Sequence, residues 1–355
     1  MALAEQADPF GSKYTYHRAS FTGTAGEYFG IWIVNILLTI VTFGIYSAWA
    51  KVRRNRYFYG NTVMLGETFE YHARGKQILI GRLIVFGFFA ALNILTHVAP
   101  LLVLILWLVM AIALPWMMMR SLRFNARVTS YRNVRFDFVG TYGGACKALY
   151  LGGLITVISL GFLSPFATRW FHRYIFNNLR YGDRPFSTEP RLGAIYKVFA
   201  VAVAIGVIGV LILGFVFATI AFEAVGPADS KTASAAAGYA GLVATLIIYL
   251  LVGLYYRAAI RNIIWSAAMV DGRHALWSDL GRRRYAWIAI SNVVISIITL
   301  GLMRPWAAVR LQRYVVQHTA INIDGDIGLV TDQIRSIGGV ISAEYFDADG
   351  FDFGF

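Results

Sequence analysis

The stretch "TFGIYSAWAKVRRNRY" (Thr42 to Tyr57) begins as apolar sequence suited to a lipid bilayer and ends in a cluster of positive charge. Similar stretches recur as "SLGFLSPFATRWFHRY" (Ser159 to Tyr174) and "TLGLMRPWAAVRLQRY" (Thr299 to Tyr314). The three align without gaps on a shared glycine and end in the same Arg–Tyr pair. The chain therefore carries an internal repeat, whose copies we place at residues 26–62, 143–181 and 284–322.

Each copy predicts a helix, a turn and a second helix. The shared glycines, Gly44, Gly161 and Gly301, supply the backbone angles of the turn. Hydroxyl residues two and five positions earlier can bond backbone carbonyls where the first helix ends. Pro165 and Pro305 suit the first turn of the second helix. The alternative for each copy is one continuous helix with a small kink.

Weaker matches to parts of the repeat occur elsewhere. "PWMMMRSLRF" (Pro115 to Phe124) keeps the spacing of the aromatic and arginine residues without the glycine, and "GLYYRAAIRN" (Gly253 to Asn262) keeps only the arginines. Upstream, "FTGT" (Phe21 to Thr24) and "FVGT" (Phe138 to Thr141) place a glycine 21 residues before the shared glycine of the first and second copies. Only Leu280–Gly281 remains of this motif in the third copy.

The composition is that of a membrane protein. Of the 355 residues, 58% are hydrophobic and 14% are charged, against about 25% charged in soluble domains. Mean hydropathy is +0.59. Long apolar runs predict two helical hairpins, over residues 78–119 and 196–256, and hence four membrane-spanning helices.

The distribution of charge predicts the topology. Net charge is +13, and arginine clusters stand at both ends of each long hairpin and of each repeat copy. Cations of membrane proteins favour the cytoplasmic side. Only re-entrant repeat units keep every cluster on that side. We therefore predict four spans, three re-entrant units and cytoplasmic termini; the alternative is seven spans, which keeps the number of helices but breaks the charge rule.

The predicted fold class is an all-α polytopic membrane protein. It comprises a bundle of four spanning helices and three repeated helix–turn–helix units, with small cytoplasmic β-hairpins near residues 61–75, 129–141 and 177–188. We divide the chain into a polar N-terminal segment (residues 1–20), one membrane domain (21–320) and an acidic cytoplasmic tail (321–355). The tail holds seven acids and one base, and it either docks on the basic layer or hangs free.

The arrangement resembles the YjgN-like family of bacterial inner-membrane proteins. The likeness is carried by "GEYFGIWIVNILLTIVTFGIYSAWAKVRRNRYFYGNT" (Gly26 to Thr62) and its two diverged copies. It extends from about Phe21 to the acidic tail. The resemblance implies a multi-pass protein of the bacterial inner (cytoplasmic) membrane, and it implies no activity.

The bands of arginine and aromatic residues are the strongest chemical feature. They predict sites for anionic phospholipid headgroups, or else plain anchoring at the interface. The residues assigned to headgroup binding are Trp49, Arg53, Arg56, Arg173, Trp306, Arg310 and Arg313. Asn35 and Asn292, each nine residues before a shared glycine, are intramembrane polar candidates; the alternative role is a hydrogen bond between helices.

Other classes of function have little support in the sequence. The single cysteine excludes a cysteine-based metal cluster, the histidines show no metal-ligand spacing, and no catalytic set, cofactor motif or nucleic-acid motif appears. We expect a non-enzymatic protein that binds lipid or organises the membrane, with anionic phospholipids as partners and no metal or cofactor. The alternative is a small-solute transporter or channel built from re-entrant glycine tips. The sequence does not predict the oligomeric state.

Overall fold

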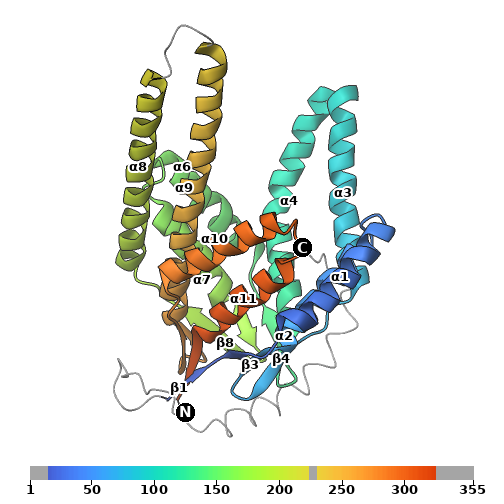
Figure 1. Ribbon diagram of the computed structural model, residues 1–355. Coiled ribbons are helices and arrows are strands. Elements are labelled where there is room, and N and C mark those ends of the chain that lie inside the picture. Colours follow the sequence, from blue (N-terminus) through green and yellow to red (C-terminus); the bar gives the residue numbers. More distant parts are fainter. Residues whose placement is uncertain (1–14, 224–229, 325–355) are drawn as a thin grey trace.

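Helix pairs and β-hairpins alternate along the chain (Figure 1). The computed structural model describes residues 15–223 and 230–324. The first two units are α1 (Ala25–Val41), α2 (Ser47–Gly60), β3 (Thr62–Met64) and β4 (Glu67–Tyr71), then α3 (Gly75–Val98), α4 (Pro100–Arg127), β5 (Thr129–Tyr131) and β6 (Val134–Phe138). The third is α5 (Tyr142–Cys146), the π-helical turn η1 (Lys147–Leu151), α6 (Gly152–Ile158), α7 (Ser164–Asn177), β7 (Leu179–Tyr181) and β8 (Arg184–Thr188).

The fourth and fifth units follow the same order. They are α8 (Leu192–Glu223), α9 (Ser230–Ser266), β9 (Ala268–Val270) and β10 (His274–Ser278), then α10 (Arg282–Ile298), α11 (Arg304–Gln317) and β11 (Thr319–Ile323). The missing second strand of the fifth unit comes from the other end of the chain, as β1 (Thr15–Arg18) and β2 (Ser20–Phe21). The weak sequence matches at Pro115 and Gly253 fall in α4 and α9, so the structure has five related units.

The strands form one antiparallel ring. From β2 to β11 each strand pairs with its neighbours in chain order, and β11 pairs with β1, with Tyr16 opposite Asn322. β1 and β2 are separated only by Ala19, whose N–H donates to the carbonyl of Thr319 at 2.9 Å, and β2 then pairs with β3. The ring therefore closes through the N-terminal strand.

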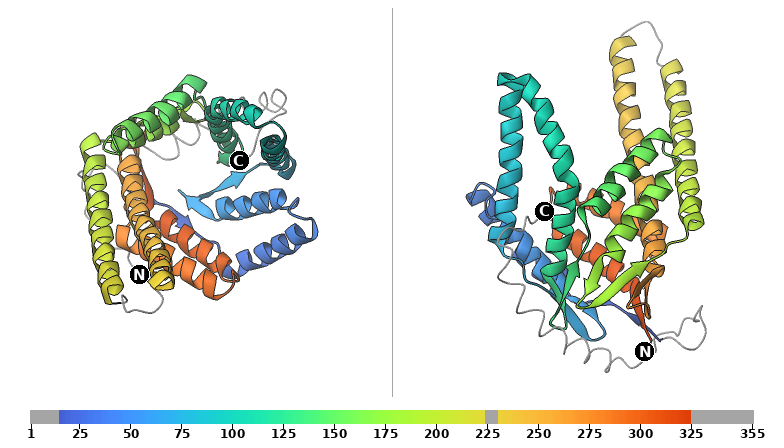
Figure 2. Two further views of the ribbon diagram at one scale, coloured as in Figure 1. Left: turned by 90° about the horizontal axis from the view of Figure 1, so that it is seen from above. Right: turned by 180° about the vertical axis from the view of Figure 1, so that it is seen from behind.

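The helices form a second ring on the same scaffold. Each second helix packs on the second strand of its unit, as α2 does on β4 and α11 does on β2. It also packs against the first helix of the next unit, and α11 returns to α1. Seen from above, the helix pairs surround the sheet (Figure 2).

The predicted all-α class is wrong, because the hairpins do not stay separate. The three predicted hairpins are present as β3–β4, β5–β6 and β7–β8, but they join the strands of the other two units in a single sheet. Strands of two to five residues have little stability in isolated hairpins. Pairing between units supplies the neighbours that each hairpin lacks.

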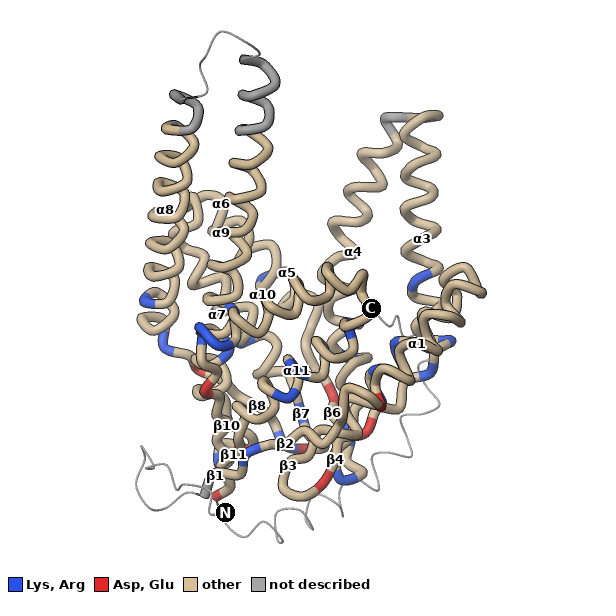
Figure 3. Tube along the Cα trace, in the orientation of Figure 1, with Lys and Arg blue, Asp and Glu red and all other residues tan. Residues whose placement is uncertain are grey.

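Four helices are long and apolar enough to cross a membrane. They are α3, α4, α8 and α9, with windows of mean hydropathy between 1.9 and 2.9. Figure 3 shows lysine and arginine gathered around the sheet and the adjoining helix ends, whereas the outer parts of these four helices are tan wherever the figure colours them by residue type. The cations that the sequence predicts on one side of the membrane are therefore gathered at the end of the protein that holds the sheet.

The three shorter hairpins, α1–α2, α6–α7 and α10–α11, leave the sheet and return to it (Figures 1 and 2). Since the strands before and after each hairpin belong to one sheet, both ends of every hairpin lie on the same side of the protein. The re-entrant path of these hairpins through the bilayer stays a prediction. Residues 1–14 and 325–355, which include most of the predicted N-terminal segment and acidic tail, lie outside the described residues.

Candidate functional site

The tips of the short hairpins have one backbone design. Gly44, Gly161 and Gly301 have φ of +91°, +93° and +90°, and the residue before each also has a positive φ. Each glycine N–H donates to the carbonyl five residues earlier at 2.7–2.8 Å. Hydroxyls bond the same turn: Thr42 Oγ1 donates to the carbonyl of Leu38 at 2.7 Å and accepts from the N–H of Tyr46 at 2.9 Å.

Asn35 and Asn292 hold the first and third of these hairpins together. Arg53 Nη1 lies 3.3 Å from Asn35 Oδ1, and Arg310 Nη1 lies 3.2 Å from Asn292 Oδ1. Asn292 Nδ2 also donates to the carbonyl of Ala307 at 2.8 Å. Both amides are buried, and both make the hydrogen bond between helices that was their alternative role. In the middle copy Gly152 lies against Ala167, and close packing replaces the polar pair.

A second set of arginines ties the second helices α2, α4 and α11 to the backbone that follows a β-hairpin or strand of the same unit. Arg56 donates to the carbonyls of Tyr71 and Ala73 at 3.3 and 3.4 Å, and Arg123 donates to those of Phe138 and Gly140 at 3.1 and 3.3 Å. Arg313 makes the corresponding bond, 2.9 Å long, to Gly23. Arg173 instead pairs with Glu189 at 2.7 Å. All five arginines assigned to headgroup binding therefore have internal partners.

The tyrosine after these arginines explains the upstream glycine motif. Tyr57 and Tyr174 donate their hydroxyls to the carbonyls of Thr24 and Thr141 at 2.7 and 3.0 Å. A Cβ built on Gly23 or Gly140 would lie 2.8 or 2.7 Å from that hydroxyl oxygen. The rings of Phe21 and Phe138 lie equally close or closer, at 2.8 and 2.4 Å, so glycine is needed there because both the tyrosine and the phenylalanine crowd the backbone.

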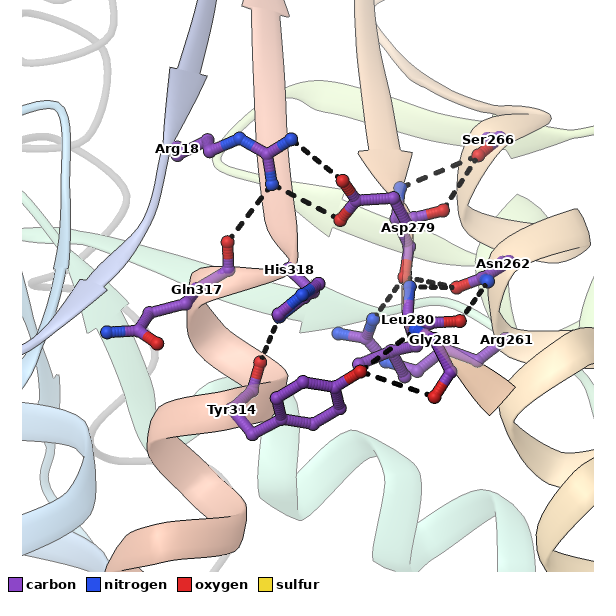
Figure 4. Close-up of polar contacts among 11 residues, drawn as sticks. Arg18, Arg261, Asn262, Ser266, Asp279, Leu280, Gly281, Tyr314, Gln317 and His318 are labelled. Carbon is purple, nitrogen blue, oxygen red and sulfur yellow. Dashed lines mark hydrogen bonds and ion pairs between the residues drawn. The ribbon is translucent and has the colours of Figure 1, made fainter. Parts of the chain in front are cut away.

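The fifth unit adds a polar network where the ring closes (Figure 4). Arg18 on β1 forms an ion pair with Asp279 at 2.7 Å and donates to the carbonyl of Gln317 at 3.2 Å. The Tyr314 hydroxyl accepts from the N–H of Gly281 at 2.9 Å. Asn262 Nδ2 donates to the carbonyl of Leu280 at 2.9 Å, in the role that arginine has in the first, second and fifth units. These contacts join β1, α9, α11 and the start of α10.

Three of the predicted headgroup residues meet in one groove. Trp306, Arg310 and Arg313 line a groove of 640 Å³ together with Arg284 and Trp287 from α10. We call this the tryptophan groove. The Arg310 guanidinium lies 5.0 Å from the Trp306 ring. No described acidic residue lines the groove.

The other predicted residues lie elsewhere. Trp49, Arg53 and Arg56 occupy the corresponding face of α2, where Trp49 covers Gly75 so closely that a Cβ there would lie 2.5 Å from its ring. Arg173 lies in the third unit. The structure thus divides the seven residues among three units. Arg284 and Trp287 were missed, although their spacing of three places them on one helix face.

One cluster has the residue types of a catalytic triad without its geometry. His72 Nε2 lies 2.7 Å from Ser130 Oγ and 3.3 Å from a carboxylate oxygen of Glu70. A triad needs the hydroxyl and the carboxylate on different ring nitrogens. Burial lowers the pKa of His72, with the charge of Arg135 adding to the effect. Within residues 15–223 and 230–324, no group of three or more His, Cys, Asp or Glu could hold a metal ion.

The comparison with known proteins agrees with the sequence resemblance. Residues 16–348 match a family described as bacterial protein of unknown function, DUF898. The chain belongs to the DUF898 family. This confirms the predicted relationship, since the chain is also similar to proteins named inner membrane protein YjgN.

The DUF898 chain is 26% identical to the YjgN protein of Salmonella typhimurium, over 87% of this chain and 89% of that protein. It is 34% identical to the protein of Escherichia coli O157:H7 over 44% of this chain and 39% of that one, and 35% identical to that of strain K12 over 41% and 37%. No solved structure matches. The names of these relatives and the four apolar helices identify a membrane protein, and neither supplies an activity.

Proposed function

We propose that the protein binds the headgroups of anionic phospholipids at the bacterial inner membrane, without catalysing a reaction. The observation that carries this proposal is the tryptophan groove, in which three arginines and two tryptophans meet with no described acid among the lining residues. Basic pockets between helices on the cytoplasmic side bind such headgroups. Tryptophan is enriched at the depth of the headgroups.

The availability of the arginines supports the same assignment. Arg284 has only a contact with the Tyr314 ring, at 5.9 Å, among the described residues. Arg310 uses one terminal nitrogen for Ser291 and Asn292, and Arg313 uses one for Gly23. Guanidinium groups carry five donors, so hydrogen-bonding capacity remains for a phosphate. In this proposal the sheet and both termini face the cytoplasm, where the cations of membrane proteins concentrate.

The alternative of a transporter with a pore at meeting glycine tips has less support. Phe43, Leu160 and Leu300, beside the three tip glycines, are 97%, 90% and 94% exposed. Tips that met around a pore would cover one another. Large apolar side chains at isolated tips favour contact with lipid instead.

The test is lipid retention by the purified full-length protein. Arg284→Gln removes the arginine that has no internal hydrogen bond, and Arg283→Gln, an exposed neighbour outside the groove, is the matched control. Native mass spectrometry after exposure to mixed phosphatidylglycerol and phosphatidylethanolamine measures bound lipid. We expect Arg284→Gln to lose phosphatidylglycerol selectively. Equal retention in the wild type and both variants would refute headgroup binding at this groove.

A further inference from the structure

A second, larger groove lies where the ring of helices closes. It has a volume of 1190 Å³ and runs between the hairpins α1–α2 and α10–α11. We call it the seam groove. Around the ring, this is the one place in the described structure where two short hairpins are neighbours, because α11 packs against α1. The row of long apolar helices is therefore interrupted at the seam, as the view from above shows (Figure 2).

One side of the seam groove is basic. Lys51 and Arg54 from α2, Arg82 from α3 and Arg304 from α11 all line it, and no described acidic residue does. Arg82 donates to the hydroxyl of Ser47, and the Arg54 guanidinium lies 5.8 Å from the Phe58 ring. The side chains of Lys51 and Arg304 have no hydrogen bond or ion pair with a described residue. Cations near apolar surface are costly without a partner, so this arrangement favours an anionic ligand.

The surroundings of Lys51 in the seam groove disfavour its charged form. Burial lowers the pKa of Lys51, and the positive charges of Arg82 and Arg54 lower it further. A negative group placed among these cations would offset both effects. The same helix face is uncharged in α7, where Thr168 and Phe171 stand at the places of Lys51 and Arg54, so the basic side is specific to the seam.

The other side of the groove is mainly apolar. The first helices α1 and α10 line it with Trp32, Ile36, Ile40, Val293 and Ile297, the turn after α10 adds Leu300, and the polar residues of this wall are Asn35, Thr39, Asn292 and Ser296. Ile40, Ile297 and Leu300 are also exposed, at 67%, 68% and 94%, so this wall continues outward to the hairpin tips. A small soluble anion would leave this wall uncovered, whereas acyl chains would cover it.

We propose that the seam groove holds one anionic phospholipid that enters sideways from the bilayer between the two short hairpins. Lys51, Arg54 and Arg304 bind its phosphate, Arg82 adds charge beside Ser47, and an acyl chain lies along α1 and α10. This site shares no arginine with the tryptophan groove, so the two proposals can be tested independently. It assigns a lipid-holding role to the seam of the ring.

Photocrosslinking tests this assignment in membranes. A photoreactive phenylalanine analogue at Ile297, in the groove wall, is compared with one at Ile298, an exposed neighbour that does not line the groove. The full-length protein is irradiated in vesicles of phosphatidylethanolamine with a minority of phosphatidylglycerol, and crosslinked lipids are identified by mass spectrometry. We expect Ile297 adducts enriched in phosphatidylglycerol and Ile298 adducts with the composition of the vesicle.

Charge variants then test the basic side. Lys51→Gln with Arg304→Gln should reduce the enrichment at Ile297 by roughly fivefold for each lost cation, whereas Arg284→Gln should leave it unchanged. Competition with inorganic phosphate at millimolar concentration distinguishes a site for a phospholipid headgroup from a site for a soluble anion. If it abolishes the enrichment, the groove is a site for soluble anions and the lipid proposal is wrong. Identical adducts at Ile297 and Ile298 would also overturn it.

Discussion

Arg313 Nη2 lies 2.9 Å from the carbonyl oxygen of Gly23, although the two residues are 290 positions apart. The bond is the counterpart of the bonds from Arg56 to Ala73 and from Arg123 to Gly140, which act within a short stretch of chain. The fifth unit thus uses the N-terminal strand as the other units use their own second strand. Ring closure therefore depends on contacts between the two ends of the described chain.

Replacing Arg313 with alanine should destabilise the protein by weakening this closure. A hydrogen bond from a charged donor contributes about 1.5–3 kcal/mol. Arg283→Ala, at an exposed position, should have little effect. Thermal unfolding in detergent compares the two variants, and an unchanged melting temperature for Arg313→Ala would show that the contact does not hold the ring.

Gly140→Ala should disturb the turn that precedes α5. The added methyl group would lie 2.4 Å from the Phe138 ring and 2.7 Å from the Tyr174 hydroxyl oxygen, and overpacking of this kind costs about 1–3 kcal/mol. Gly143→Ala, which meets nothing within 4 Å, is the control. Tyr174→Phe in the Gly140→Ala background should recover part of the lost stability, because it removes the crowded oxygen. No recovery would assign the loss to another contact.

Gly161→Ala should strain the tip of the middle hairpin. At φ of +93° a residue with a Cβ loses about 1–2 kcal/mol relative to glycine. Open space surrounds this glycine, so the cost comes from the backbone and not from packing. Gly153→Ala, in α6 with equal space, should be neutral or stabilising. Equal melting temperatures for the two variants would contradict the strained turn.

Binding of anionic lipid in the seam groove should weaken as the pH rises in the alkaline range. Lipid binding favours charged Lys51, whose pKa is lowered by burial and by the charges of Arg82 and Arg54. Affinity is therefore full below that pKa and falls as the pH passes above it. Lys51→Arg keeps the charge at every accessible pH, so it should flatten the profile. Titration of vesicle-bound protein with a fluorescent anionic lipid at a series of pH values measures the affinity profiles of the wild type and of Lys51→Arg.

The sequence allowed local features to be predicted, because their causes are local. The glycine turns at residues 44, 161 and 301, the long apolar helices and three of the hairpins follow from composition and spacing over short stretches. The resemblance to YjgN rests on the same repeat.

The closed sheet could not be predicted in that way. Pairing of Tyr16 with Asn322 joins distant strands whose own sequences carry little signal. The relationship of the fourth unit to the repeat is weak in the sequence because Asn262 stands where the other units have an arginine. The seam groove was missed for a similar reason: Lys51 and Arg304 come from different hairpins, and only ring closure makes those hairpins neighbours.

The central claim is that all five units return to one sheet on one side of the membrane. Thr68 on β4 and Ser187 on β8 are exposed strand residues, and a seven-span topology would place them on opposite sides. Single cysteines at these positions, in a Cys146→Ala background, are labelled in intact cells and in inverted vesicles with a membrane-impermeant thiol reagent. We predict labelling of both in inverted vesicles and of neither in intact cells. Labelling of Thr68→Cys from outside, with Ser187→Cys protected, would contradict the closed ring.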